Sequence, residues 1–170
     1  VLILAFIIFP GMLFSADLVT SSGKPVTDSE IKKWAITVYP SGKGLPQGSG
    51  TAVDGKAVYQ VQCLACHGAD GKNGMATRLV GAAGFPEGSR DPLKALSVGA
   101  WPNSTSIFDY IQRAMPHYAP KSLSSDQVYS LTAYILNLNG LIEENELINK
   151  TTLPSVKMPN QENVINVWVE

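Results

Sequence analysis

Two cysteines and a histidine stand together in the segment Cys63-Leu64-Ala65-Cys66-His67, and their spacing indicates a specific chemistry. They include the only two cysteines among the 170 residues of the chain. Two thiols on one helical turn are able to add to two vinyl groups at the same edge of a porphyrin. The next residue, His67, then presents its imidazole to the iron. The pattern therefore predicts one covalently bound haem c, attached through Cys63 and Cys66, with His67 as an axial iron ligand.

Three other uses of a cysteine pair are alternatives to haem attachment. A thioredoxin-like redox pair needs a surrounding βαβ pattern, and the sequence shows none. A structural zinc site needs four ligands, but beyond the motif the chain offers one further histidine, His117, and no second ligand pair. A disulfide between the two cysteines is the third alternative. We favour haem attachment over these three together.

A haem that transfers electrons needs a second axial ligand. The candidates are Met75, Met115, Met158 and His117. Met75 follows His67 too closely to reach around the ring edge, and Met158 lies in a C-terminal arm. Met115 stands in the loop "QRAMPHYAP", where Pro116 restricts the backbone. We predict Met115 as the distal ligand, with His117, Met158 or an open site as alternatives. A thioether ligand raises the reduction potential relative to a second histidine.

Helical periodicity predicts three helices that would position these residues. The first covers residues 54–66 and carries the cysteine motif at its end. The second lies within "STSIFDYIQRAMP" and stops at Pro116. The third follows Ser124 and ends at Asn139-Gly140. No alternating strand pair is evident, so the fold class is predicted to be all-α with much irregular chain.

Helix-start signals support these three segments. Asp54 is a good N-cap residue for the first helix. Ser106 followed by Asp109 resembles a capping box for the second, and Ser124 followed by Gln127 matches the same pattern for the third.

The ends of the chain differ from this helical centre. Residues 1–16 are apolar and are predicted to be a signal peptide, with an uncleaved N-terminal anchor as the alternative. Residues 17–50 are predicted to form an irregular strap with one short β-like piece at 35–39. Residues 51–140 are the haem domain. Residues 141–170 are a C-terminal arm, which is predicted to be anchored by Leu147, Leu153, Val156 and Trp168.

Composition limits the function classes. Hydrophobic residues make up 45% of the chain and charged residues 16%, which fits an ordinary globular domain. The formal net charge of −1 gives no field that would attract nucleic acid or an anionic membrane surface. We therefore predict no nucleic-acid partner, and membrane association only if the N-terminal segment is retained.

A known family becomes visible at two places. The segment "DGKAVYQVQCLACHGADGKNG" resembles the amino-terminal haem motif of class I cytochromes c, with Gly55 and Tyr59 at the positions of that family's glycine and aromatic residue. The segment "SDQVYSLTAYILNLNG" is similar to the last helix of the family, whose aromatic residue packs across the glycine. Tyr134 would be that aromatic residue. The resemblance implies a class I cytochrome c fold with irregular N- and C-terminal arms.

A narrower resemblance covers most of the chain after the N-terminal segment. The segments "WPNSTSIFDYIQRAMPHYAPKSLSSDQVYSLTAYILNLNG", "WAITVYPSGKGLPQGSGT" and "LPSVKMPN" resemble the haem subunits of periplasmic sulfite dehydrogenases and sulfur (sulfane) dehydrogenases. In those complexes a molybdenum-cofactor subunit oxidises the sulfur compound, and the cytochrome passes the electrons to another cytochrome c. The resemblance implies that Cys63 and Cys66 hold the haem and that His67 and Met115 are its axial ligands.

Two features depart from the related families. Many class I cytochromes have a proline whose carbonyl orients the proximal imidazole, whereas this chain has Thr77 in "MATRLVG". That hydrogen bond is therefore left unassigned. Sulfur dehydrogenase cytochromes often carry a second haem domain, but this chain has one haem motif and no room for another. This favours the single-haem sulfite dehydrogenase type.

Three residues are candidates to contact the haem propionates. Arg78 and Arg113 each carry a guanidinium that matches a carboxylate, and Trp101 carries an indole N–H donor. The alternatives are equally plausible: the two arginines would be solvated surface charges, and Trp101 would be a rim or core aromatic residue. Pocket-lining or simple core packing is predicted for Leu64, Leu79, Phe85, Phe108 and Tyr118.

These observations predict an exported, periplasmic single-haem cytochrome that transfers electrons and has little catalytic chemistry of its own. Its predicted partners are a molybdenum-cofactor subunit like that of sulfite dehydrogenase and an acceptor cytochrome c. One alternative is a free periplasmic carrier between respiratory complexes. Another is a haem sensor or enzyme with an open sixth site, and a third is a haem-free structural protein.

Overall fold

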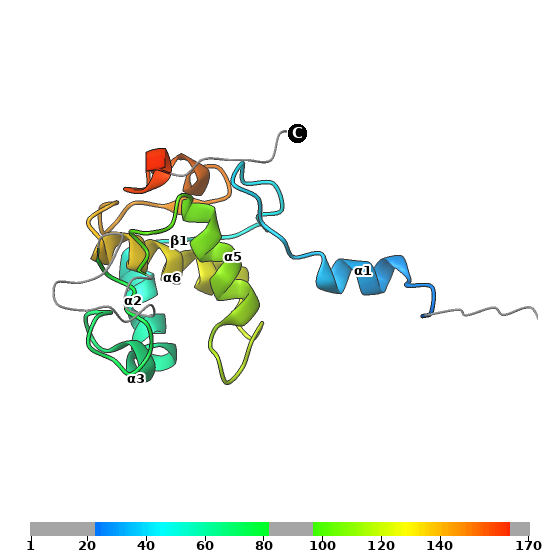
Figure 1. Cartoon of the computed structure of the whole chain (residues 1–170), viewed down its shortest axis with the longest axis horizontal. Helices are drawn as coiled ribbons and strands as arrows, with labels where there is room; N and C mark the ends of the chain where they lie inside the picture. Colours follow the sequence, from blue (N-terminus) through cyan, green and yellow to red (C-terminus); the bar gives the residue numbers. More distant parts are fainter. Residues whose placement is uncertain (1–22, 82–96, 164–170) are drawn as a thin grey trace, which may run out of the picture. The chain divides into compact units, whose positions relative to one another are not determined.

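The computed structural model of the chain describes residues 23–81 and 97–163 (Figure 1). It divides into two compact units, Val1–Trp34 and Ala35–Glu170. The predicted signal peptide or anchor at residues 1–16 lies outside the described residues, and the predicted domain boundaries stay predictions. Within the described ranges, no helix combines the length and the apolar character needed to cross a membrane.

The described part of the first unit contains one short helix, α1 (Asp28–Trp34), which the sequence reasoning missed. A reciprocal cap begins it. The backbone N–H and the hydroxyl of Thr27 donate to the Glu30 carboxylate, at 2.9 and 2.7 Å, and the Glu30 N–H donates back to the hydroxyl. None of the residues of α1 is buried. The helix is seven residues long and its two large apolar residues, Ile31 and Trp34, are exposed, so it has too short a pattern for the sequence to reveal it.

The second unit is mainly helical, and the predicted all-α class is confirmed. Its helices are α2 (Ala52–Gln62), α3 (Leu64–His67), α5 (Ser104–Ala114) and α6 (Ser125–Leu138). Its short remaining elements are β1 (Ser49–Gly50), β2 (Ile148–Asn149) and the 3₁₀ turns η1 (Leu153–Ser155) and η2 (Gln161–Asn163). β1 and β2 pair antiparallel, a contact between the two arms that was not predicted.

The helix starts correct two predictions and confirm one. α2 is capped by Thr51, and Asp54 is the third helical residue of that capping box rather than the N-cap itself. α5 begins at Ser104 after Asn103, without a side-chain cap. The predicted Ser106–Asp109 box does not form, because the Asp109 carboxylate binds elsewhere. The capping box of α6 is present as predicted, with Ser124 as the N-cap.

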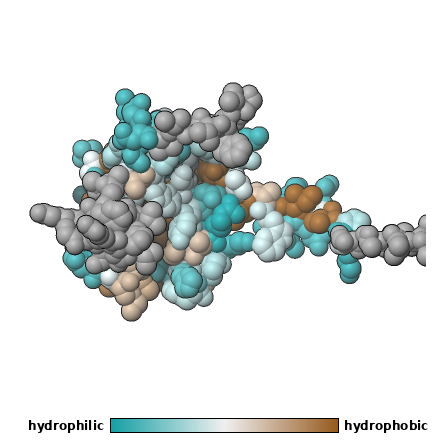
Figure 2. Space-filling view, viewed as in Figure 1, coloured by the Kyte–Doolittle hydropathy of each residue, from teal (hydrophilic) through white to brown (hydrophobic). Residues whose placement is uncertain are grey.

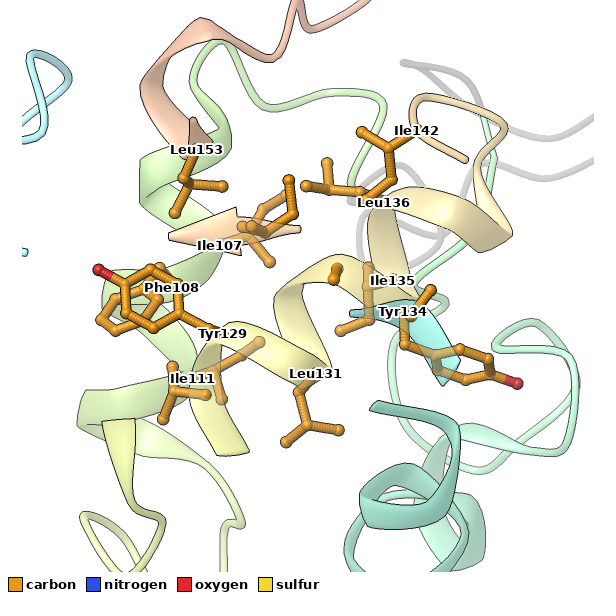
Figure 3. Packing of buried hydrophobic residues seen from close by; sticks show 14 of the residues in the cluster. Ile107, Phe108, Ile111, Tyr129, Leu131, Tyr134, Ile135, Leu136, Ile142 and Leu153 are labelled. Atoms are coloured by element: carbon orange, nitrogen blue, oxygen red, sulfur yellow. The ribbon is translucent and has the colours of Figure 1, made fainter. Parts of the chain in front are cut away.

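The core is built around α6, which is buried from Val128 to Leu136 without interruption. Figure 3 shows side chains of α5 and of the C-terminal arm converging on it. Phe108 and Tyr129 lie with their ring centroids 4.5 Å apart. The outer face is mostly hydrophilic to intermediate, with small hydrophobic spots (Figure 2). Apolar burial around α6 is therefore the main stabilising term of this unit.

The predicted crossing of α2 over α6 at a glycine is confirmed. A Cβ atom placed on Gly55 would lie 1.9 Å from the carbonyl oxygen of Ser130 and 2.7 Å from the Cβ atom of Tyr134. The ring of Tyr134 packs against that of Tyr59, with centroids 5.1 Å apart. The glycine permits the close approach of the two helices, and the tyrosines fill the space beside it.

Both arms pack on this helical centre in part as predicted. Residues 35–39 form neither helix nor strand, so the predicted β-like piece is wrong, and Val38 among them is buried. In the C-terminal arm Leu153 is fully buried and Val156 is half-buried, whereas Leu147 is exposed and was wrongly predicted as an anchor. Trp168 lies outside the described residues.

Candidate functional site

The cysteine motif lies where α2 gives way to α3. Cys63 is both the C-cap of α2 and the residue before α3, and the N–H groups of Cys66 and His67 donate to its carbonyl oxygen at 3.1 and 2.9 Å. Both cysteines are free thiols. Cys63 is half-buried against the core, and Cys66 is exposed. A tight turn thus presents two unpaired sulfurs and an imidazole from five consecutive residues.

Burial affects the chemistry of the first thiol. Desolvation by burial, with a smaller contribution from the neighbouring Cys66, raises the pKa of Cys63 to about 11. At this position on the edge of the core, the free thiol of Cys63 is therefore protonated at neutral pH. Because Cys63 is half-buried at the edge of the core, its sulfur is suited to contact with an apolar group rather than with water.

The imidazole of His67 has a fixed orientation. Its Nδ1 atom lies 2.9 Å from the carbonyl oxygen of Thr77. A carbonyl oxygen only accepts, so Nδ1 carries the proton and Nε2 keeps a lone pair free to bind a metal. The sequence left this hydrogen bond unassigned because Thr77 replaces a proline, and the structure shows that the Thr77 carbonyl makes the contact.

The loop after the motif folds tightly over α3. A Cβ atom on Gly74 would lie 2.0 Å from the carbonyl oxygen of Cys66, and the Ala76 N–H donates to that same oxygen at 2.9 Å. The Tyr59 hydroxyl donates to the carbonyl oxygen of Gly68 at 2.7 Å, and burial raises the pKa of this tyrosine. These contacts bring Thr77 back to the imidazole.

Asn139 connects this loop to the core helix, and sequence reasoning saw it only as a helix stop. It is the C-cap of α6. Its side chain accepts from the Gly81 N–H at 3.1 Å and donates to the carbonyl oxygens of Leu79 and Ile135 at 3.2 and 2.8 Å. An asparagine at a helix end carries no sequence signal for such a long-range role. The separation of about 60 residues is visible only in the fold.

The four predicted distal-ligand candidates differ in burial, and Met115 lies at the edge of the core. It is the C-cap of α5, its N–H donates to the Ile111 carbonyl oxygen at 3.0 Å, and its side chain is half-buried against the core. Met75 is 89% exposed, and Met158 is only 4% exposed within the core. His117 is exposed.

A hydrogen bond ties the loop after Met115 to the cysteine motif. The hydroxyl of Tyr118 donates to the Oε1 atom of Gln62, the residue directly before Cys63. Tyr118 follows Met115 by three residues, so the segments that carry the sulfur and imidazole groups are brought to the same end of the unit. Sequence reasoning placed Tyr118 in an apolar pocket, whereas it is 71% exposed.

The predicted propionate contacts have other partners in this structure. The Arg113 guanidinium forms an ion pair with Asp109, with Nη2 to Oδ1 at 2.9 Å. Trp101 packs edge-on against Tyr110, with ring centroids 5.6 Å apart. The Arg78 side chain lies over Gly81, where a Cβ atom would meet its Nη1 atom at 2.3 Å.

The remaining predicted pocket residues divide between core and surface. Phe108 is fully buried in the core, and Leu79 is half-buried at its edge. Leu64 is 39% exposed. Phe85 lies outside the described residues.

Residues 50–135 match the family model described as cytochrome c oxidase, cbb3-type, subunit III. The chain belongs to this family of c-type cytochromes. A solved structure, the sulfane dehydrogenase SoxCD from Paracoccus pantotrophus, is similar with a TM-score of 0.72 and 31% identity, over 86% of this chain and 71% of that one. The fold is therefore that of a cytochrome c domain.

A second relative also acts on a sulfur compound. The thiosulfate dehydrogenase of Allochromatium vinosum is 32% identical over 104 residues, which are 56% of this chain and 36% of that protein. The chain thus spans little more than a third of this relative. Together the comparisons identify a cytochrome c electron-transfer domain that is related to the haem subunits of sulfur dehydrogenases.

The family implies haem c, and the residues of this site fit that group. Two thiols are free, and the imidazole has its Nε2 atom available. The thioether of Met115 lies on a segment bonded to the motif through Tyr118. Cys63, Leu79 and Met115 are each apolar and only half-buried by the protein, as side chains in contact with a large apolar ring would be.

Proposed function

We propose that this cytochrome is the single-haem electron-accepting subunit of a molybdenum-dependent complex that oxidises an inorganic sulfur compound. It would pass the electrons to another cytochrome c. Cys63 and Cys66 would hold the haem covalently, and His67 and Met115 would be the axial ligands. The observation that carries this assignment is the His67–Thr77 hydrogen bond, because it directs the one remaining ring nitrogen toward a metal.

The residues of the site have separable tasks. When bound, haem c supplies a reversible one-electron iron couple. The Thr77 carbonyl fixes the tautomer of His67 and increases its basicity. The thioether of Met115 would favour the reduced state of the iron, and Cys63 and Cys66 would hold the ring covalently. No acid/base step is required of the protein.

The fold of the arms supports the proposal of a sulfur-oxidising complex. The similarity to the sulfane dehydrogenase structure covers 86% of the chain, whereas the family match covers only residues 50–135, about half of it. The structural similarity therefore includes arm residues. Arms of this kind suit attachment to a partner subunit. We propose that the protein is periplasmic, since covalent haem attachment requires export to a compartment with a dedicated attachment system.

Replacement of Met115 tests the axial assignment. In the oxidised haem protein, Met115→Ala should lose the weak far-red absorption band that reports a thioether–iron bond, and its reduction potential should fall. The matched control is Met75→Ala, because Met75 is 89% exposed and follows the same motif. The control should keep both the band and the potential. An unchanged spectrum in Met115→Ala would exclude this ligand.

A second experiment tests the partner. The full chain, purified under native conditions from a host that exports it with its own partner genes, should bring molybdenum with it. Sulfite or thiosulfate should then reduce its haem. A preparation without molybdenum, whose haem is reduced only by another reduced cytochrome, would instead indicate a free carrier.

A further inference from the structure

A folded segment of the N-terminal arm joins the two helices on either side of Met115. We call residues 36–49 the bracing segment and residues 115–123 the Met115 loop. This loop runs from the end of α5 to the start of α6. The bracing segment makes hydrogen bonds to both of these helices, so it fastens the loop at its two ends.

The attachment to α5 is made by polar side chains of its second half. The Oδ1 atom of Asp109 accepts from the Val38 N–H at 2.9 Å. The Nε2 atom of Gln112 donates to the Ile36 carbonyl oxygen at 2.6 Å. Val38 itself is only 8% exposed, so its backbone N–H has little access to water in place of Asp109.

Arg113 holds the Asp109 carboxylate in place for this contact. Its Nε and Nη2 atoms donate to the two carboxylate oxygens at 3.1 and 2.9 Å, and Nη2 also lies 3.4 Å from the Thr37 hydroxyl. The Asp109 side chain is 22% exposed. The Arg113 side chain is 40% exposed, so the pair contributes modest energy and acts mainly by holding the carboxylate toward Val38.

The attachment to α6 uses its first two turns. The Oδ1 atom of Asp126 accepts from the Ser49 N–H at 2.8 Å, and the Tyr129 hydroxyl donates to the Pro46 carbonyl oxygen at 2.9 Å. These two residues lie just after the point where the Met115 loop ends. The far end of the loop is therefore fixed to the same segment as the near end.

The bracing segment is itself tightly folded between these attachments. A Cβ atom on Gly44 would lie 2.1 Å from the Thr37 carbonyl oxygen, and Gly44 has a φ of +92° that favours glycine. The Tyr39 N–H donates to the Lys43 carbonyl oxygen at 2.9 Å. Close backbone packing of this kind resists extension, so the segment acts as a short stiff link between α5 and α6.

We propose that Asp109 is a positioning residue that sets how firmly Met115 is held as an iron ligand. The inference rests on the proposed axial role of Met115. Met115 is fixed to the last turn of α5 by its bond to Ile111, and Asp109 lies in the preceding turns that bind the bracing segment. Loss of the carboxylate leaves Gln112 as the main remaining attachment of that segment to α5 and makes the helix end freer to move, which weakens the retention of the thioether.

Competition with imidazole measures this retention directly. The oxidised full-length haem protein is titrated with imidazole, which displaces a weakly held thioether, and loss of the far-red band is followed. The imidazole concentration that displaces half of the thioether should be about three- to tenfold lower for Asp109→Ala than for the wild type. Loss of a hydrogen bond to a carboxylate suggests a change of this size. Asp109→Asn should lie between the two, because its amide oxygen still accepts from Val38.

A stability control separates positioning from general loosening. Asn149 organises the turn of the C-terminal arm through bonds to the N–H groups of Thr151 and Thr152, at 2.8 and 3.1 Å. Asn149→Ala should lower the unfolding temperature, yet leave the imidazole midpoint and the reduction potential unchanged. Asp109→Ala should lower the imidazole midpoint. This shift should remain when the variant is compared with another variant of equal unfolding temperature.

Each outcome bears on one of the two proposals. If the wild type itself lacks the far-red band, the axial role of Met115 is wrong and the present inference falls with it. If the wild type has the band but Asp109→Ala and Asn149→Ala show the same midpoint as the wild type, the positioning role alone is overturned. Should Asp109→Ala fail to fold, Gln112→Ala removes the bond to Ile36 and the longer contact to Asp109, leaves the bond from Val38 to Asp109 in place, and should still shift the midpoint in the same direction.

Discussion

The core around α6 and the loop around the cysteine motif are stabilised in different ways. In α6 nine consecutive residues, Val128 to Leu136, are buried. In α3 none is buried, and between residues 68 and 81 only Gly71 and Val80 are. The loop keeps its shape through individual hydrogen bonds, namely Tyr59 to Gly68, His67 to Thr77, and Asn139 to Leu79 and Gly81.

This difference has a physical origin in what each region must do. A core gains stability from continuous apolar burial, which is non-directional and tolerates small adjustments. A haem-binding loop must leave apolar and metal-binding groups accessible, so it has less burial of its own to draw on. Directional bonds from the rigid helix then fix its geometry. Core substitutions should therefore act through volume, and loop substitutions through single hydrogen bonds.

The largest effect is expected where α2 crosses α6. Gly55→Ala would place a methyl group 1.9 Å from the Ser130 carbonyl oxygen, on backbone that cannot move aside without separating the helices. We expect a loss of about 3 kcal/mol or more in the free energy of unfolding. Urea unfolding measures it, with the exposed neighbour Lys56→Ala as the control. If Gly55→Ala left the free energy of unfolding nearly unchanged, the space between α2 and α6 would not limit the size of the residue at this position.

A smaller effect is expected at the connection between the two regions. Asn139→Ala removes the partner of the Gly81 N–H and leaves the Leu79 carbonyl oxygen with only the Val98 N–H, at a cost of about 1–3 kcal/mol. The loop that carries Thr77 would loosen, so the haem absorption spectrum should broaden as well.

The matched control for this change is Asn137→Ala. That neighbouring amide donates to the Ile142 carbonyl oxygen at 3.0 Å, in the C-terminal arm. The control should lower stability without altering the spectrum. Equal spectra for both variants would show that the loop holds its shape without Asn139.

The smallest effect is expected from acid titration of Asp109. Burial raises its pKa, but hydrogen bonds from Arg113 and the Val38 N–H outweigh burial, so the net pKa is lowered. A lowered pKa in the folded state means that the carboxylate stabilises the fold fully above its ordinary value of about 4. That stabilisation is lost as the pH falls through the folded-state pKa.

The comparison of wild type with Asp109→Asn measures this contribution. The difference in unfolding free energy should be at most about 1 kcal/mol near neutral pH, since the partner guanidinium is 40% exposed. It should shrink as the pH falls below about 4. A difference that grows in acid would have the wrong sign for a carboxylate stabilised in its charged form.

Local patterns in the sequence predicted the helices whose periodicity and caps were strong. The start of α6 at Ser124 was predicted correctly, because a capping box is a short pattern that one helix turn contains. The crossing at Gly55 was predicted correctly from the resemblance to class I cytochromes c, since it joins distant segments. The start of α2 was placed at Asp54 rather than Thr51, because both residues of a capping box look like N-caps. α1 was missed because it has only seven residues and none of them is buried.

Sequence alone determined the chemistry of this protein: a pair of thiols, an adjacent imidazole and a methionine in a proline-flanked loop indicated haem c before any fold was known. Only the tertiary structure decided what holds those groups. Thr77 orients the imidazole, Asn139 fixes the loop, and Asp109 binds the arm to α5. The reason is physical. Ligand identity is a property of side chains close together in the chain, whereas their support comes from backbone groups and side chains that meet only when segments distant in the sequence pack together.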